Sequence, residues 1–193
     1  MSNWIQLASG RSFNLTGEES PIAITDIAAS LSKINRFAGA SLVPYSVAQH
    51  SVDVCRLVRK HEGTLAEQML ALLHDAHEIV INDIPSPTKW ELKLAAGGLD
   101  HVETLSREIQ VRILRGIGMP ALLPFMDQSV VAFCDLKALA AEKRDLMAYC
   151  DRPWIDLPAP DKKRIKPKGW RAAEREFLAK YYELLPRVQE EYA

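Results

Sequence analysis

Long apolar runs and cysteine pairs are missing from this sequence. No apolar run approaches the roughly 18 residues that a membrane-spanning helix needs. The three cysteines, Cys55, Cys134 and Cys150, form no C-x-x-C pair and each lies in apolar, helix-like sequence, which predicts buried free thiols in a reducing compartment. The first residues also lack a basic segment followed by an apolar one, so we expect a soluble, cytoplasmic protein with no membrane partner.

Glycine-rich phosphate loops and an excess of one charge are missing as well. Neither G-x-x-x-x-G-K-[ST] nor G-x-G-x-x-G occurs, which argues against P-loop and dinucleotide chemistry. Lys and Arg total 24 against 25 for Asp and Glu, so no global field favours a nucleic acid polymer. Basic residues concentrate only over 162–168. That run predicts either a lid that attracts a triphosphate or, as is commoner for charge runs, a solvated loop.

Helical periodicity is what the sequence does have. At 193 residues, 48% of them hydrophobic, one core suffices, and we predict a single domain over residues 1–193. Recurrent apolar stripes predict an all-α bundle of about six helices. These helices are expected over 25–35, from Ser46, from Thr64 through His74 and Asp75, over 102–116, over 128–150 and over 170–187.

The remaining segments carry turn and loop signals. Residues 1–24 predict a small hairpin or an irregular arm. Pro85 and Pro87 are expected to end helical continuation and hold an extended turn. Residues 151–169, rich in proline and basic side chains, are expected to form a loop. Ser46 and Gln49 match the capping-box pattern at the start of one helix.

Four ionisable residues fall where helices should be apolar. His74 and Asp75 interrupt a Leu-rich run, His50 lies on the apolar stripe of its helix, and Asp135 lies on that of another. Buried imidazole and carboxylate groups need a partner, and a divalent cation satisfies both kinds. Two imidazoles and two carboxylates form an N2O2 set for one ion, whether Mn, Co, Ni, Zn, Mg or Fe. From spacing alone, the alternative is that these are ordinary core residues, each with its own hydrogen-bond partner and no shared ion.

The same four residues carry a resemblance. His50, His74-Asp75 and Asp135 match, in order and helical setting, the H...HD...D signature of the HD-domain metal-dependent phosphohydrolases. Blocks at 34–37, 74–78 and 83–89 resemble those of bacterial 5'-deoxynucleotidases and of phage dATP triphosphohydrolases. The resemblance covers about residues 25–147 and implies an all-helical HD fold with one divalent cation.

The resemblance further implies an enzyme whose substrate is a small-molecule nucleotide. It favours hydrolysis of a deoxynucleoside 5'-monophosphate, which releases orthophosphate. The alternatives are a deoxynucleoside triphosphate triphosphohydrolase, which releases tripolyphosphate, and a non-catalytic HD module that binds nucleotide or metal. A homo-oligomer is compatible with the resemblance, although no stripe in the sequence identifies an interface.

Roles for five further residues follow from the matching blocks. Glu78 is expected to orient the attacking water or act as general acid or base, and Asp83 to lie near the sugar and the leaving oxygen. Arg36 is expected to hold phosphate, with Lys89 adding positive charge. Phe37 stands where the 5'-deoxynucleotidases typically have Trp. Ordinary surface, turn or core roles are the alternatives for these residues.

Three other histidines are not assigned to the site. His77 is expected to face away from Glu78 and to bind no metal unless a second ion exists. His61 and His101 have charged neighbours and are expected at the surface.

Overall fold

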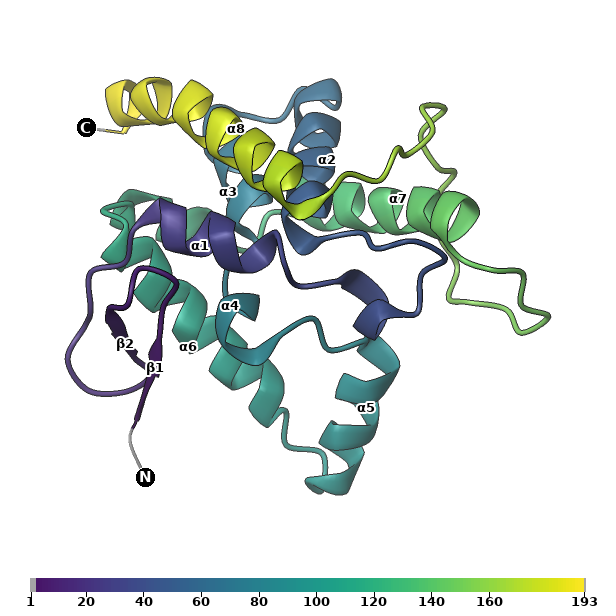
Figure 1. The fold of residues 1–193 in the computed structure, drawn as a ribbon, viewed down its shortest axis with the longest axis horizontal. Coiled ribbons are helices and arrows are strands. Elements are labelled where there is room, and N and C mark those ends of the chain that lie inside the picture. Colours follow the sequence, from purple (N-terminus) through teal and green to yellow (C-terminus); the bar gives the residue numbers. More distant parts are fainter. Residues whose placement is uncertain (1–2, 193) are drawn as a thin grey trace.

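The computed structural model describes residues 3–192, and it confirms the all-α class with a short N-terminal arm (Figure 1). Within these residues lie eight α-helices, two 3-10 helices and one two-stranded sheet. The α-helices are α1 (Ile24–Leu31), α2 (Val47–Lys60), α3 (Leu65–Leu73), α4 (Glu78–Ile81), α5 (Ser86–Ala95), α6 (His101–Gly116), α7 (Ser129–Leu146) and α8 (Trp170–Glu191). The 3-10 helices are η1 (Arg36–Gly39) and η2 (Pro120–Phe125). None of the described helices is both long and apolar enough to cross a membrane.

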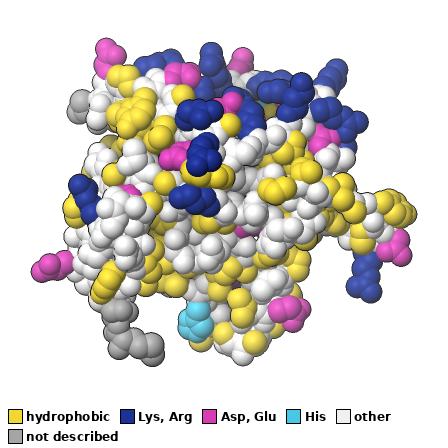
Figure 2. Space-filling view, in the orientation of Figure 1, with side chains coloured by type: hydrophobic (Ala, Val, Ile, Leu, Met, Phe, Trp, Pro, Cys, Tyr) yellow, Lys and Arg dark blue, Asp and Glu magenta, His cyan; other side chains and the backbone are white. Residues whose placement is uncertain are grey.

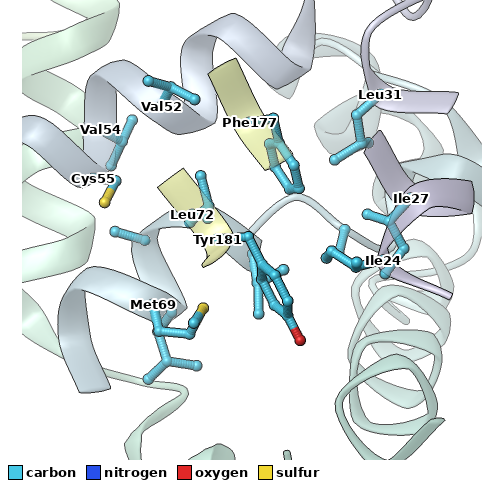
Figure 3. Close-up of a cluster of buried hydrophobic side chains, with 14 of the residues drawn as sticks. Ile24, Ile27, Leu31, Val52, Val54, Cys55, Met69, Leu72, Phe177 and Tyr181 are labelled. Atoms are coloured by element: carbon cyan, nitrogen blue, oxygen red, sulfur yellow. The ribbon is translucent and has the colours of Figure 1, made fainter. Parts of the chain in front are cut away.

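The apolar core lies where α8 crosses α1, α2 and α3 (Figure 1). Figure 3 shows the rings of Phe177 and Tyr181 from α8 between side chains of α1 and of α3. Phe177 and Leu72 are fully buried, and Tyr181 is nearly so. Burying a side chain of this size stabilises the fold by about 1.5–3 kcal/mol relative to leaving it exposed. These contacts fix α2 and α3 in place beside α7.

The N-terminal arm is the hairpin, one of the two predicted alternatives. Strands β1 (Trp4–Gln6) and β2 (Ser12–Asn14) pair antiparallel, with Ile5 opposite Phe13. Phe13 is fully buried in the core. Asp26 of α1 accepts hydrogen bonds from the backbone N–H and the hydroxyl of Ser9, at 2.7 and 3.0 Å. The arm is therefore tied to the helical bundle at its turn.

Helices α4 and α5 were not predicted, because the prolines between them were interpreted as a helix stop. Pro87 instead lies in the first turn of α5, where a backbone N–H has no helical partner and its absence costs nothing. In addition, α3 ends at Leu73. His74 and Asp75 therefore lie in a turn over residues 74–77, not inside a helix as expected.

Several helix ends also differ from prediction. Helix α1 ends at Leu31, not near residue 35, and α7 ends at Leu146, not at residue 150. Helix α8 continues through Pro186 to Glu191, beyond the predicted end at residue 187. Residues 151–169 form a loop, as expected. Cys150 lies just before that loop and is exposed, which corrects its prediction as a buried thiol, whereas Cys55 and Cys134 are buried.

The basic segment 162–168 is held against the helices. Figure 2 shows Lys and Arg side chains gathered along the upper part of one face, over the region where Figure 1 draws α8 and the chain leading into it. Arg164 pairs with Asp145, and Lys168 pairs with Glu176. These ion pairs favour the solvated-loop interpretation over a lid that attracts a triphosphate.

Gln49 also holds this segment, which corrects part of the capping prediction. Ser46 does cap α2, accepting a hydrogen bond from the Gln49 backbone N–H at 3.3 Å. The Gln49 side chain, however, donates to the Lys166 carbonyl and accepts from the Lys168 N–H, both at 2.9 Å. The amide is thus used for a tertiary contact more than 100 residues away and not for a local cap.

Candidate metal centre

The four residues predicted as metal ligands come together from α2, the turn over 74–77, and α7, and ligand atoms of His50, His74 and Asp135 lie within 4.8 Å of one another. His50 Nε2 lies 3.0 Å from Asp135 Oδ1, 3.3 Å from His74 Nε2 and 3.6 Å from Asp75 Oδ2. His74 Nε2 lies 3.2 Å from Asp75 Oδ2 and 3.9 Å from Asp135 Oδ1. Ligand atoms about 2.0–2.2 Å from one ion are themselves roughly 3–4 Å apart. The donor set therefore fits a divalent cation.

Both imidazoles present the correct nitrogen to this donor set. His50 Nδ1 lies 2.6 Å from Glu142 Oε1, and His74 Nδ1 lies 2.8 Å from the Ala71 carbonyl oxygen. A carboxylate and a carbonyl can only accept, so each Nδ1 carries the proton and donates. This leaves the Nε2 lone pairs for the donor set, which is the arrangement found in metal-binding histidines.

Glu142 is the functional residue that sequence reasoning missed. Glu142 follows Asp135 by seven residues, about two turns of helix, and the sequence analysis assigns it no role. In the structure it is fully buried between His50 and Arg36, and Arg36 Nε donates to its second oxygen at 3.0 Å. Glu142 therefore both orients the His50 ring and balances the Arg36 charge.

Arg36 is more deeply engaged than the sequence suggested. Besides Glu142, its Nη1 atom lies 3.7 Å from Asp75 Oδ2 and 3.9 Å from Asp83 Oδ1. These two distances are too long for good hydrogen bonds, so Nη1 keeps donor capacity for another group. The residue expected to hold phosphate thus belongs to the charge network of the centre.

The crowding of opposite charges shifts the pKa values of the four ligand candidates. Burial and the Arg36 cation lower the pKa of His50, but Glu142 and Asp135 outweigh them and raise it to about 10. Burial would raise the pKa of Asp75, yet His74, His50 and Arg36 hold it well below its usual range. The two carboxylates thus attract positive charge to the imidazoles. A cation that replaces the imidazole protons satisfies the same carboxylates.

The turn that carries His74 and Asp75 is held by Gln110 of α6. The Gln110 amide donates to the Leu73 carbonyl at 2.7 Å and accepts from the His77 backbone N–H at 3.1 Å. The Leu73 carbonyl, at the end of α3, also accepts from the Ala76 N–H at 2.9 Å, and Gln110 takes the place of the helical partner that the His77 N–H lacks. Gln110 thereby fixes the break between α3 and α4 that directs Asp75 toward His50.

Glu78 and His77 lie together beside Asp75. The Glu78 side chain is only 3% exposed, and its Oε2 atom has no hydrogen-bond partner among residues 3–192. Burial, followed by the neighbouring Asp75 and Asp83 charges, raises the pKa of Glu78 to about 9. His77 was expected to face away from Glu78, which is wrong: ligand atoms of Asp75, His77 and Glu78 lie within 4.8 Å of one another. The helical rotation used for that prediction does not apply across the turn.

Asp83 and Phe37 meet at the edge of a cavity. The Phe37 backbone N–H donates to Asp83 Oδ2 at 2.6 Å, and this contact holds Phe37 in the left-handed region at φ 59°. Asn82 is also left-handed, at φ 62°. Such conformations cost energy in non-glycine residues and concentrate at functional sites. The adjoining cavity of about 380 Å³ is lined by Lys33, Ile34, Asn35, Ala38, Gly39, Asn82 and Asp83.

The other predicted substrate contacts are less direct. Phe37 is half-buried, and its ring centroid lies 6.0 Å from that of Trp154, which comes from the loop after α7. Lys89 lies in α5. Burial of the His77 imidazole is the largest cause of its lowered pKa, and the Lys89 charge lowers this pKa further. His61 and His101 are exposed, as predicted.

Comparison with known proteins gives two relatives of similar length. The uncharacterized protein YfdR of Escherichia coli strain K12 is 36% identical over 145 residues, which cover 75% of this chain and 72% of YfdR. An uncharacterized protein of Rhodobacter capsulatus is 32% identical over 154 residues, which cover 77% of this chain and 75% of the relative. No family model matches the chain.

Proposed function

This chain belongs to the family of Escherichia coli YfdR, and we propose that it is a metal-dependent phosphohydrolase of the HD-domain type. Its substrate would be a deoxynucleoside 5'-monophosphate. The observation that carries the proposal is the pair of Nε2 atoms, 3.3 Å apart, with both Nδ1 atoms occupied by acceptors. Two carboxylates, Asp75 and Asp135, complete this set.

Openness of the site supports catalysis over a purely structural ion. The Asp135 side chain is 39% exposed, whereas His50 and Glu142 are fully buried. A cation held there would be covered by protein on one side and open to water and substrate on the other. Sites with protein ligands on one side and free positions on the other are typical of catalytic ions.

The chemistry follows from the side chains around that opening. A divalent cation bound there supplies positive charge that polarises a phosphoryl oxygen and lowers the pKa of water from 15.7 to about 7. In hydrolysis the water oxygen bonds to phosphorus, the phosphorus–oxygen ester bond breaks, and the leaving oxygen takes a proton. Glu78, beside Asp75, is placed to hold or move that proton. Asp75 and Asp135 accept from the attacking water and orient it.

The nucleotide would occupy the cavity beside Asp83. At about 380 Å³ this cavity falls within the usual range for small-molecule sites, roughly 300–1,000 Å³. Arg36 lies between the cavity residue Asp83 and the centre, with Nη1 free to donate to a phosphate oxygen. Phe37, next in the chain to the cavity residue Ala38, would be the aromatic side chain that contacts the base. Arg164 and Lys168 are already ion-paired with Asp145 and Glu176, so they give no support to the binding of a triphosphate.

The test is a panel of deoxynucleoside mono- and triphosphates incubated with Mn²⁺-replete protein, with orthophosphate and tripolyphosphate measured separately. We expect orthophosphate from monophosphates. Tripolyphosphate would instead identify a triphosphohydrolase, and release of neither product from any nucleotide, with Mn²⁺ bound, would favour a binding module.

Asp135→Asn and Asp151→Asn are the matched variants for this test. Asp135→Asn removes one carboxylate of the centre and should abolish release. Asp151→Asn makes the same chemical change in an exposed loop and should leave release unchanged. Equal activity of the two variants would exclude the centre as the source of the hydrolysis.

A further inference from the structure

We propose that Asp75, His77 and Glu78 form a second divalent-cation site beside the first. Ligand atoms of these three residues lie within 4.8 Å of one another, as do those of His50, His74 and Asp135 in the first group. The proposal rests on the proposed centre only in sharing Asp75, whose Oδ2 atom lies near His50 and His74. A carboxylate has two oxygens, so one residue can serve two ions.

The Glu78 carboxylate points to a missing partner at this place. The side chain is 3% exposed, yet Oε2 has no hydrogen-bond partner among residues 3–192. A buried Glu78 oxygen without a hydrogen-bond partner is costly, and ligand atoms of Asp75 and His77 lie within 4.8 Å of a ligand atom of Glu78. A cation between Asp75, His77 and Glu78 removes this deficit with no change of fold.

His77 is suited to complete the set. Its backbone N–H is held by Gln110 of α6, and one ring nitrogen contacts the His74 backbone, so the residue is fixed in position and the other ring nitrogen is left for another contact. One nitrogen and two carboxylate oxygens suit Mn²⁺, Zn²⁺ or Fe²⁺, with water in the remaining positions. The turn over residues 74–77 brings the three residues together, because a continuous helix would separate adjacent side chains by about 100°.

The second ion should bind more weakly than the first. It has three protein ligands where the first has four, and one of the three, Asp75, is shared. Two-metal sites that share a carboxylate hold their ions roughly 3.5–4 Å apart. Two Mn²⁺ ions at this separation couple magnetically, which gives a spectroscopic signature that neither ion produces alone.

Electron paramagnetic resonance of the 193-residue protein, stripped of metal and titrated with Mn²⁺ alone, tests this second site. The wild type should bind two ions per chain and develop a coupled signal as the second binds. His77→Ala and Glu78→Gln should each bind one ion, with an uncoupled signal. His101→Ala, which removes an exposed imidazole at the start of α6, should still bind two.

Four outcomes would overturn the second site. These are a single bound ion in the wild type at millimolar Mn²⁺, two uncoupled ions, two coupled ions in both His77→Ala and Glu78→Gln, or loss of both ions from folded His77→Ala. Circular dichroism identifies which variants are folded. Failure here is separate from failure of the proposed function: a one-ion protein that releases orthophosphate retains the function, and a two-ion protein that releases nothing retains the second site.

Discussion

Two regions of this molecule differ in chemistry although each contains fully buried side chains. In the core between α8, α1 and α3, Phe177 is fully buried among apolar groups; at the centre between α2 and α7, His50 and Glu142 are fully buried as an ion pair. Apolar burial stabilises the fold, whereas burying charge costs free energy unless each group is paired. We therefore expect the core to provide most of the stability and the centre to provide the proposed metal binding. Substitutions should separate the two.

The largest expected effect is that of Asp75→Ala at the centre. In this variant Mn²⁺ affinity and turnover should each fall by more than about 100-fold. This exceeds the loss of roughly 10–100-fold that is typical when the replaced residue contacts a metal ligand and not the metal itself. Far-UV circular dichroism should remain close to wild type, because the change removes a charge and leaves the apolar core intact. Full turnover in Asp75→Ala would refute its assignment as a ligand.

Phe177→Ala should produce the converse result. Removing the ring leaves a cavity in the core and should lower the free energy of unfolding by about 3–5 kcal/mol. The Mn²⁺ affinity of the folded molecules should be unchanged, because Phe177 is not among the residues of the centre. Urea denaturation measures the free energy of unfolding, and a Mn²⁺ titration at low temperature measures the affinity. A large loss of Mn²⁺ affinity without loss of stability would contradict the expectation that Phe177 stabilises the fold and does not take part in Mn²⁺ binding.

Glu142→Gln tests the contact that links the centre to Arg36. The variant keeps the size of the side chain but removes the charge that orients His50 and pairs with Arg36. Mn²⁺ affinity should fall by about 10–100-fold. Glu190→Gln, an equal change on the exposed face of α8, is the control and should bind Mn²⁺ as the wild type does. Unchanged affinity in Glu142→Gln would mean that His50 needs no such partner.

The smallest expected effect lies away from both regions, at Asp145. Hydrogen bonds from Arg144, the Ile165 N–H and Arg164 hold the pKa of this carboxyl well below its usual range. A lowered folded-state pKa stabilises the protein above the unfolded-state value of about 3.9, and this stabilisation is lost as the pH falls toward the folded-state pKa. Asp145→Asn should therefore be less stable than wild type by about 1 kcal/mol at pH 7.

The difference between Asp145→Asn and wild type should shrink below pH 4. Urea denaturation at pH 7 and pH 3.5 measures both values. A difference that grows as the pH falls would contradict the sign of the shift, and with it the role of Asp145 in fixing the basic segment.

The sequence predicted what depends on helical periodicity. The stripe that contains His50 is buried as expected, and Val47, Val54 and Val58 on the same face are fully buried with it. Asp135 and Glu142 share one face of α7 because seven residues make two turns of a helix. Helical periodicity therefore predicted which faces of α2 and α7, two of the three elements of the centre, carry its residues.

What the sequence did not predict depends on breaks in that periodicity and on distant partners. The end of α3 at Leu73 is fixed by Gln110 of α6, which no local pattern reveals. That break reverses the expected orientation of His77 relative to Glu78. Pro87 is compatible with either the end or the start of a helix, and only the packing of α5 on α6 decides between them. The partners of Glu142 likewise lie 92 and 106 residues away along the chain.

Diffraction from crystals soaked in Mn²⁺, recorded at the manganese absorption edge, tests the central claim most directly. We expect an anomalous peak about 2.0–2.2 Å from His50 Nε2, His74 Nε2 and a carboxylate oxygen of each of Asp75 and Asp135. The absence of any peak at that position, with Mn²⁺ at saturating concentration, would contradict it.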